Sequence, residues 1–217
     1  MELKNTADVL VRILEAMKHA RGEDKARSIL THVKVDVHSD AVSFTATNGR
    51  ILAKVTLGKP KEASIDSEWR MGLAEGSYLA SADAVERAIA LCKLEKKAKR
   101  GSTVVGLEVT PADGEGFPDT QGVIGEGTPV NGADVLWFDP ELVTPLMACA
   151  KRLECGEVRF NVRGPFDAMR LDAYHERFAH NVRFVGLVMP LKPTDVAAAG
   201  VKASINWALE GRPGQDT

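Results

Sequence analysis

The sequence predicts an α+β fold in which amphipathic helices alternate with runs of antiparallel strands. A helical pattern recurs three times along the 217 residues, at 6–20, 83–100 and 140–153. Short stretches of alternating apolar and polar residues follow the helices, as expected for strands with one buried face. The pair Asn48-Gly49 is a strong signal for a tight hairpin. We therefore expect repeated βαβββ half-domains with the helices on one face of antiparallel sheets.

The first half-domain is expected at 1–58. Its helix carries an apolar stripe formed by Val9, Leu10, Ile13, Leu14 and Met17. A short strand at 2–4 precedes the helix, and three strands follow it, at 30–37, 42–47 and 51–57. Leu30 is expected on the first of these three strands.

The second half-domain is expected at 73–127 and the third at 128–192. Ser81 and Asp139 stand where helix N-caps are preferred, and Pro140 occupies the first helical position. The remaining predicted strands lie at 77–80, 103–110, 135–138, 157–162, 168–173 and 182–189. Residues 193–217 form a C-terminal tail whose pattern is compatible with a helix at 194–209.

Composition indicates an ordinary soluble protein, with 44% hydrophobic and 27% charged residues. No apolar run approaches the roughly 18 residues of a membrane span, and the N-terminus is not a signal peptide. The three cysteines are too few for a disulfide framework. We therefore expect a cytoplasmic protein. The net charge of −2 argues against a protein that coats nucleic acid with its whole surface, but it permits one basic face.

No catalytic residue, metal site or cofactor is predicted. The five histidines show no metal-ligand spacing, and the glycines at 114–132 form no phosphate-binding motif between a strand and a helix. Asp167 and Asp172 resemble a carboxylate pair, but carboxylates at strand edges are usually solvated. The sequence therefore favours a binding protein over an enzyme.

Basic residues gather on the predicted helices, most densely at the end of the second. The densest group is Lys93, Lys96, Lys97, Lys99 and Arg100, and the remaining basic residues on the helices are Arg87, Arg12, Lys18, Lys151 and Arg152. One interpretation is that these residues contact DNA phosphates without reading the base sequence. The other is that lysines near a helix C-terminus complement the helix dipole and solvate the helix end.

Four short stretches, in the same order along the chain, resemble the bacterial β sliding clamp, the β subunit of DNA polymerase III. They are 45–53 (TATNGRILA), Phe117-Pro118-Asp119 with Val123-Ile124, 138–142 (FDPEL) and 184–191 (FVGLVMPL). They resemble the hairpin, the interdomain segment, a helix start and the closing strand of that family. The family has six half-domains and this chain about three, as if the second domain were joined to the last half of the third.

The resemblance implies a non-enzymatic DNA polymerase processivity factor that assembles into a homo-oligomeric ring around double-stranded DNA. It also implies a pocket that binds a short linear motif of a polymerase or other replication protein. The matching positions are Leu30, Thr47, Gly49, Leu52, Pro118, Val123, Leu187, Val188, Met189, Pro190 and Leu191. Leu52, Val188 and Met189 are expected on the floor of the pocket, and Pro118 and Pro190 at its rim.

Three alternatives stay open at this stage. The pocket positions also fit an ordinary core, since Leu30 and Val188 would be buried in almost any fold. The chain also fits an adaptor or regulator of phage or mobile-element type that binds client peptides without encircling DNA. The tail at 193–217 fits a role in sealing an edge, joining subunits or covering the pocket.

Overall fold

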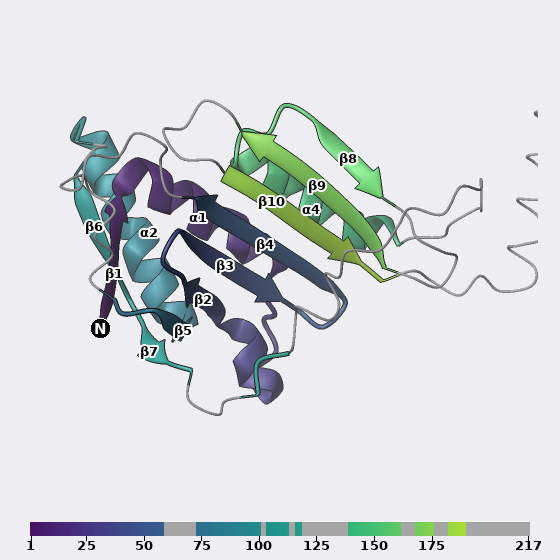
Figure 1. Ribbon diagram of the computed structural model, residues 1–217, viewed down its shortest axis with the longest axis horizontal. Helices are drawn as coiled ribbons and strands as arrows, with labels where there is room; N and C mark the ends of the chain where they lie inside the picture. Colours follow the sequence, from purple (N-terminus) through teal and green to yellow (C-terminus); the bar gives the residue numbers. More distant parts are fainter. Residues whose placement is uncertain are drawn as a thin grey trace, which may run out of the picture.

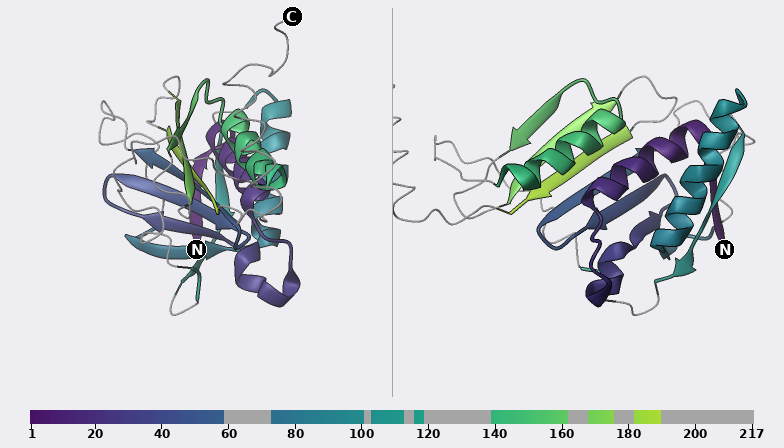
Figure 2. Two further views of the ribbon diagram at one scale, coloured as in Figure 1. Left: turned by 90° about the vertical axis from the view of Figure 1, so that its right-hand side faces the viewer. Right: turned by 180° about the vertical axis from the view of Figure 1, so that it is seen from behind.

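The computed structural model describes residues 1–58, 73–100, 103–112, 116–118, 139–161, 168–175 and 182–189. Within them, three α-helices cover one face of an antiparallel sheet (Figures 1 and 2). The α+β class and the position of the helices on one face are as the sequence predicts. The boundaries expected near 127 and 192, the strand expected at 135–138 and the helix expected at 194–209 lie outside the described residues.

The first unit follows the predicted order and adds one 3-10 helix. Its elements are β1 (Glu2–Thr6), α1 (Ala7–Ala20), η1 (Lys25–Thr31), β2 (Val33–Val37), β3 (Ala41–Thr47) and β4 (Ile51–Gly58). The hairpin predicted at Asn48-Gly49 joins β3 to β4. Asn48 Oδ1 accepts hydrogen bonds from the N–H groups of Arg50 at 2.9 Å and Ile51 at 3.0 Å. Gly49 has a φ of +87°, which favours glycine over residues with a side chain.

The strand expected to start at Leu30 starts at Val33 instead, and Leu30 lies in η1. Asp24 causes this difference, because its side chain caps η1 by accepting a hydrogen bond from the Ala26 N–H at 2.8 Å. Local bonds from Thr31 Oγ1 and His32 Nδ1 to the Ser28 carbonyl, 2.7 and 2.9 Å long, extend the turn. Such side-chain bonds compete with strand pairing.

The second and third units contribute the remaining described elements. They are β5 (Gly76–Ala80), α2 (Ala82–Lys97), β6 (Val104–Glu108), β7 (Thr110–Pro111), α4 (Pro140–Arg152), β8 (Val158–Asn161), β9 (Met169–His175) and β10 (Val182–Val188). The predicted N-caps are confirmed: Ser81 Oγ accepts from the Ala84 N–H at 3.2 Å, and Asp139 Oδ1 accepts from the Glu141 N–H at 2.9 Å. The strand predicted at 103–110 is divided, because β6 and β7 belong to different sheets.

Helix α2 is shorter than the predicted 83–100, because its last turn closes at Lys97. The Arg100 N–H donates to the Glu95 carbonyl at 2.8 Å, and Lys99 adopts a left-handed φ of 58°. These are the features of a helix C-terminal motif. Lys99 and Arg100 therefore follow the helix rather than lying on its surface.

The main sheet has the strand order β7-β5-β2-β3-β4-β10-β9-β8, and a second sheet pairs β1 with β6. Strand β4 of the first unit pairs antiparallel with β10 of the third, with Leu52 opposite Leu187 and Val55 opposite Phe184. Segments about 130 residues apart in the sequence thus lie side by side in one sheet (Figure 1).

The core lies between the sheet and the helices. Phe44, Val55 and Phe184 are fully buried in one row across β3, β4 and β10. Helix α1 packs between α2 and α4, and Figure 2 shows the three helices side by side. Among the described residues, no helix combines the length and the apolar composition needed to cross a membrane.

Candidate functional site

The sheet has an inner face toward the helices and an outer face turned away from them. Side chains alternate between these faces along each strand. The row that contains Phe44, Val55 and Phe184 is inner. A Cβ added to Gly186, two residues beyond Phe184, would lie 3.1 Å from Leu146 of α4, which confirms this side as inner. Leu187 lies one position beyond Gly186, and Leu52 lies three positions before Val55. Both side chains are therefore on the outer face.

Three of the expected pocket residues form one row on the outer face. Leu52 of β4 stands opposite Thr47 of β3 on one side and Leu187 of β10 on the other. All three are buried, with 7%, 5% and 4% of their surfaces exposed, yet none belongs to the core cluster on the inner face. Strand register, rather than proximity in the sequence, brings these residues together.

Val188 does not belong to this row. It is completely buried and packs in the core on the inner face. Because successive strand residues point to opposite faces, Val188 cannot share a surface with its neighbour Leu187. The expectation that Val188 forms part of a pocket floor is therefore corrected to a core role.

Met189 and Leu30 extend the row at the hairpin end. Met189 shares the phase of Leu187, its N–H donates to the Arg50 carbonyl at 3.4 Å, and 49% of its surface is exposed. Leu30 reaches the hairpin from η1, with its Cδ1 3.8 Å from the position a Gly49 Cβ would occupy. We call Leu30, Thr47, Gly49, Leu52, Leu187 and Met189 the outer patch. Pro118 is exposed, and Val123, Pro190 and Leu191 lie outside the described residues.

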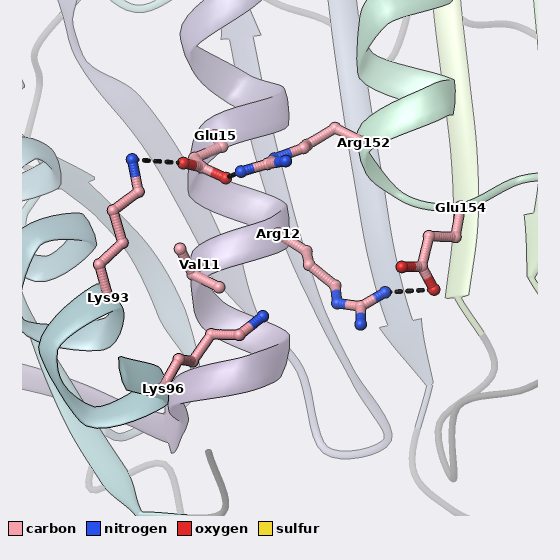
Figure 3. A pocket seen from close by; sticks show the side chains of 7 residues that line it. All are labelled: Val11, Arg12, Glu15, Lys93, Lys96, Arg152 and Glu154. Atoms are coloured by element: carbon pink, nitrogen blue, oxygen red, sulfur yellow. Dashed lines mark ion pairs between the residues drawn. The ribbon is translucent and has the colours of Figure 1, made fainter. Parts of the chain in front are cut away.

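The helix face, on the opposite side of the molecule, carries charges in pairs. A cavity of about 290 Å³ lies between α1, α2 and α4 (Figure 3). The residues that line it are Val11, Arg12, Glu15, Lys93, Lys96, Arg152 and Glu154. Glu15 Oε1 accepts from Lys93 Nζ at 2.7 Å, and Glu15 Oε2 pairs with Arg152. Arg12 pairs with Glu154 across the same cavity.

Carboxylates also hold most of the other basic residues that the sequence proposes for DNA. Lys96 pairs with Asp8 at 3.1 Å, Lys18 with Glu86 at 2.9 Å, Arg87 with Glu108 at 2.5 Å and Arg100 with Glu95 at 3.1 Å. Lys97, Lys99 and Lys151 are exposed, and within the described part of the chain no ion pair reaches them. The helix face is therefore less electropositive than its basic residues alone suggest.

Among the described residues, the local environment shifts the pKa values of one carboxylate and of the cysteines. Hydrogen bonding from Lys18, helped by the nearby charge of Arg21, lowers the pKa of Glu86 despite partial burial. Burial raises the pKa of Cys92 to about 11 and that of Cys149 to about 12, so both thiols stay protonated at neutral pH. Among the described residues, no group of three or more His, Cys, Asp or Glu side chains is arranged to hold a metal ion.

Sequence reasoning missed two groups of polar residues. The first is the set of carboxylates on the helix face, although Asp8, Arg12 and Glu15 recur at helical spacing on α1 and carry alternating charge. The second lies on the outer face beside Leu187 and contains Asp172, which the sequence predicts as a solvated carboxylate but whose side chain is only 13% exposed. There Asp172 accepts from Arg170 at 2.8 Å and from Asn161 at 2.7 Å, and Arg170 stands opposite Leu187 in register. Only the pairing of β8, β9 and β10 reveals this second group.

The chain is similar in structure to bacterial DNA polymerase sliding clamps. The DNA polymerase III β subunit from Thermotoga maritima superposes with a TM-score of 0.62 at 14% identity, covering 89% of this chain and 66% of that chain. The sliding clamp from Pseudomonas aeruginosa gives a TM-score of 0.61 at 14% identity, with 89% and 67% covered. The clamp from Bacillus subtilis gives 0.55 at 15% identity, with 89% and 65% covered.

The similarity is one of structure, since no known protein family and no curated protein matches the sequence. The chain spans about two thirds of the length of each of these clamps. The ordered sequence resemblance and the structural similarity lead to the same fold. In its fold, the chain is similar to the bacterial β sliding clamp.

Proposed function

We propose that the protein is a sliding-clamp-like processivity factor that holds replication proteins on duplex DNA. In this role it binds a client peptide on the outer patch and DNA phosphates on the helix face, and it catalyses no reaction. The observation that carries the proposal is the row of Thr47, Leu52 and Leu187 across three strands. These residues come from stretches that each resemble the clamp family at its pocket, and they lie outside the protein's own core.

The outer patch is suited to aliphatic or aromatic anchors of a short peptide. Met189 offers an exposed, adaptable thioether, while Leu52 and Leu187 supply apolar surface beneath it. Two anchors buried there would each contribute ~1.5–3 kcal/mol before ordering costs, which suits micromolar binding. Since Leu52 and Leu187 are nearly inaccessible, a peptide must displace the groups that cover them. A variant without residues 194–217 tests whether the tail competes for this surface.

The peptide side of the proposal is tested by Met189→Lys. We expect this charge on the patch to abolish binding of a short peptide that carries Leu and Phe anchors, measured by fluorescence anisotropy. Leu91→Lys is the matched control, because Leu91 on α2 is similarly exposed, at 52% against 49%. Thermal melting checks that both variants fold. If neither the wild type nor the variant without 194–217 binds the peptide at ~100 μM, the peptide role is refuted.

The DNA side requires binding that is weak, independent of base sequence and strongly dependent on salt. Lys96→Glu, Lys97→Glu and Arg100→Glu together should lower duplex affinity on unrelated sequences alike and flatten the dependence on salt. Asp40→Asn, an exposed change in the turn between β2 and β3, should leave the affinity within about twofold, because this turn is not part of the helix face and its charge is screened by salt. Equal affinity of wild type and triple variant at low salt would remove these residues from the DNA role.

A second candidate function is an adaptor of phage or mobile-element type that binds client peptides without encircling DNA. The ion pairs that hold Lys93, Arg152 and Arg12 favour it, because paired cations bind phosphate less readily. A ring requires a closed symmetric assembly, whereas an adaptor can function as a monomer. The molar mass in solution, measured by light scattering with and without duplex DNA, separates the two functions.

A further inference from the structure

The cavity between α1, α2 and α4 has the composition of a phosphate site that is already occupied by a carboxylate of the protein itself. We propose that Glu15 holds Lys93 and Arg152 in the free protein, and that a phosphate of bound DNA displaces Glu15 from them. Glu15 would then limit the affinity of the helix face for DNA. This inference rests on the proposed DNA role of the helix face.

Glu15 lies at the base of the cavity and the two cations lie at its rim. Only 12% of the Glu15 side chain is exposed, compared with 60% for Lys93 and 48% for Arg152. Lys93 extends from α2 and Arg152 from α4, and both turn inward to the carboxylate on the central helix α1 (Figure 3). The two cations therefore converge on one pair of oxygens from opposite sides.

This convergence suits a phosphate as well as a carboxylate. Guanidinium groups bind both anions through paired N–H donors, and lysine ammonium groups bind either as point charges. A phosphodiester presents two unesterified oxygens, as Glu15 does. Because both cations are about half exposed, an anion arriving from solvent reaches them without any movement of the helices.

The remaining residues of the cavity favour an incoming anion. Arg12 and Lys96 bring the cations in its lining to four, against the two carboxylates of Glu15 and Glu154. Asp8, beside the cavity, takes up Lys96 in a further pair. Neutralising Glu15 would raise the positive charge of the site by one and release two cations together.

The test compares wild type, Glu15→Gln, and Asp40→Asn in binding a short labelled duplex between about 50 and 200 mM salt. Asp40→Asn removes the same charge from the exposed turn between β2 and β3, which does not line the cavity. We expect Glu15→Gln to tighten binding about fivefold at the lowest salt, because two partly exposed ion pairs are released. We also expect it to steepen the salt dependence by about one to two phosphate contacts, whereas Asp40→Asn does neither.

Three further measurements complete the experiment. Adding Lys93→Gln to Glu15→Gln should remove much of the gain, because one of the released cations is lost. Inorganic phosphate at matched ionic strength shows whether a free phosphate competes with the duplex for the same site. Thermal melting shows whether each variant is folded, since losing two ion pairs should lower the melting temperature slightly.

The outcomes distinguish this inference from the proposed function. If wild type binds duplex DNA and Glu15→Gln binds with the same affinity and the same salt dependence, the inference is wrong and the DNA role stands. If neither protein binds duplex at low salt, the DNA role itself is refuted together with the inference. Tighter binding by Glu15→Gln that persists when Lys93 and Arg152 are both changed to Gln would also overturn it.

Discussion

On the outer face of the sheet, Thr47, Leu52 and Leu187 form a continuous uncharged row that meets Arg170 at one end, whereas the cavity on the helix face is lined by charges held in pairs. Strand register places the outer row, so alternation along three strands is enough to define it. On the helix face, the pairing between neighbouring helices decides which cations remain free. The residue types and their alternation therefore define the outer row, whereas the charge available on the helix face also depends on ion pairs between helices.

The difference is clearest at β10 and α2. On β10, neighbouring residues lie on opposite faces: Leu187 belongs to the outer patch, and Val188 belongs to the core. On α2, Lys93 and Lys97 are one turn apart, yet Lys93 pairs with Glu15 while no ion pair reaches Lys97 among the described residues. A residue's face determines its role on the sheet, and its partner determines its role on the helices.

The largest expected effect is a loss of stability on changing a core residue of β10, compared with a small loss at Met189 just after the strand. Phe184→Ala should destabilise the protein by about 3–5 kcal/mol, because it empties a fully buried position between the sheet and the helices. Met189→Ala should change stability by about 0.5 kcal/mol or less, since the side chain is half exposed, but it should weaken peptide binding. Chemical denaturation and anisotropy measure the two effects. Similar losses of stability in both variants would contradict the placement of Phe184 in the core and of Met189, just after β10, on the outer patch.

A second prediction compares free with paired cations. Lys97→Glu with Lys99→Glu should reduce duplex affinity about tenfold or more at low salt, because two available phosphate contacts become repulsive. Lys18→Glu with Arg87→Glu should reduce it less, because Glu86 and Glu108 already neutralise those cations. The measurement is a salt titration of binding for both double variants. Equal losses would mean that the ion pairs do not determine which cations reach DNA.

The smallest expected effect is the dependence of stability on pH at the α1–α2 contact. The hydrogen bond from Lys18 lowers the pKa of Glu86 in the folded protein below its ordinary value of 4.5. Ionised Glu86 therefore stabilises the fold above its unfolded pKa, and this stabilisation is lost as pH falls through the folded pKa. Wild type should therefore melt slightly above Glu86→Gln at neutral pH, and the difference should vanish in acid. If the difference in melting temperature persisted below the folded pKa, it would arise from packing rather than from the charge of Glu86.

The sequence predicts the local elements well, because their signals are local. The turn at Asn48-Gly49 and the caps at Ser81 and Asp139 all occur as expected. The pairing of β4 with β10 does not follow from either strand alone, and only the family resemblance suggests it. The apolar alternation predicts a strand at Leu30, whereas the side-chain cap at Asp24 starts η1 there.

The candidate sites divide in the same way. The residues of the outer patch could be predicted, but the sequence also predicts Val188 there, because residues 184–188 are apolar and buried on both faces and so show no alternation. The basic residues could be found on the helices, whereas their carboxylate partners could not be assigned. Glu15 meets Lys93 and Arg152 only through the packing of α1 between α2 and α4.

The central claim is that one surface holds a client peptide while the other holds DNA. Its most direct test is capture of a labelled peptide, carrying Leu and Phe anchors, on immobilised duplex DNA in the presence of the protein. We expect peptide to accumulate on the DNA only when the protein is present. Met189→Lys should abolish that signal while the protein itself stays on the DNA. The claim would be contradicted if the wild-type protein stayed on the DNA but the peptide did not accumulate there. It would also be contradicted if the peptide released the protein from the DNA.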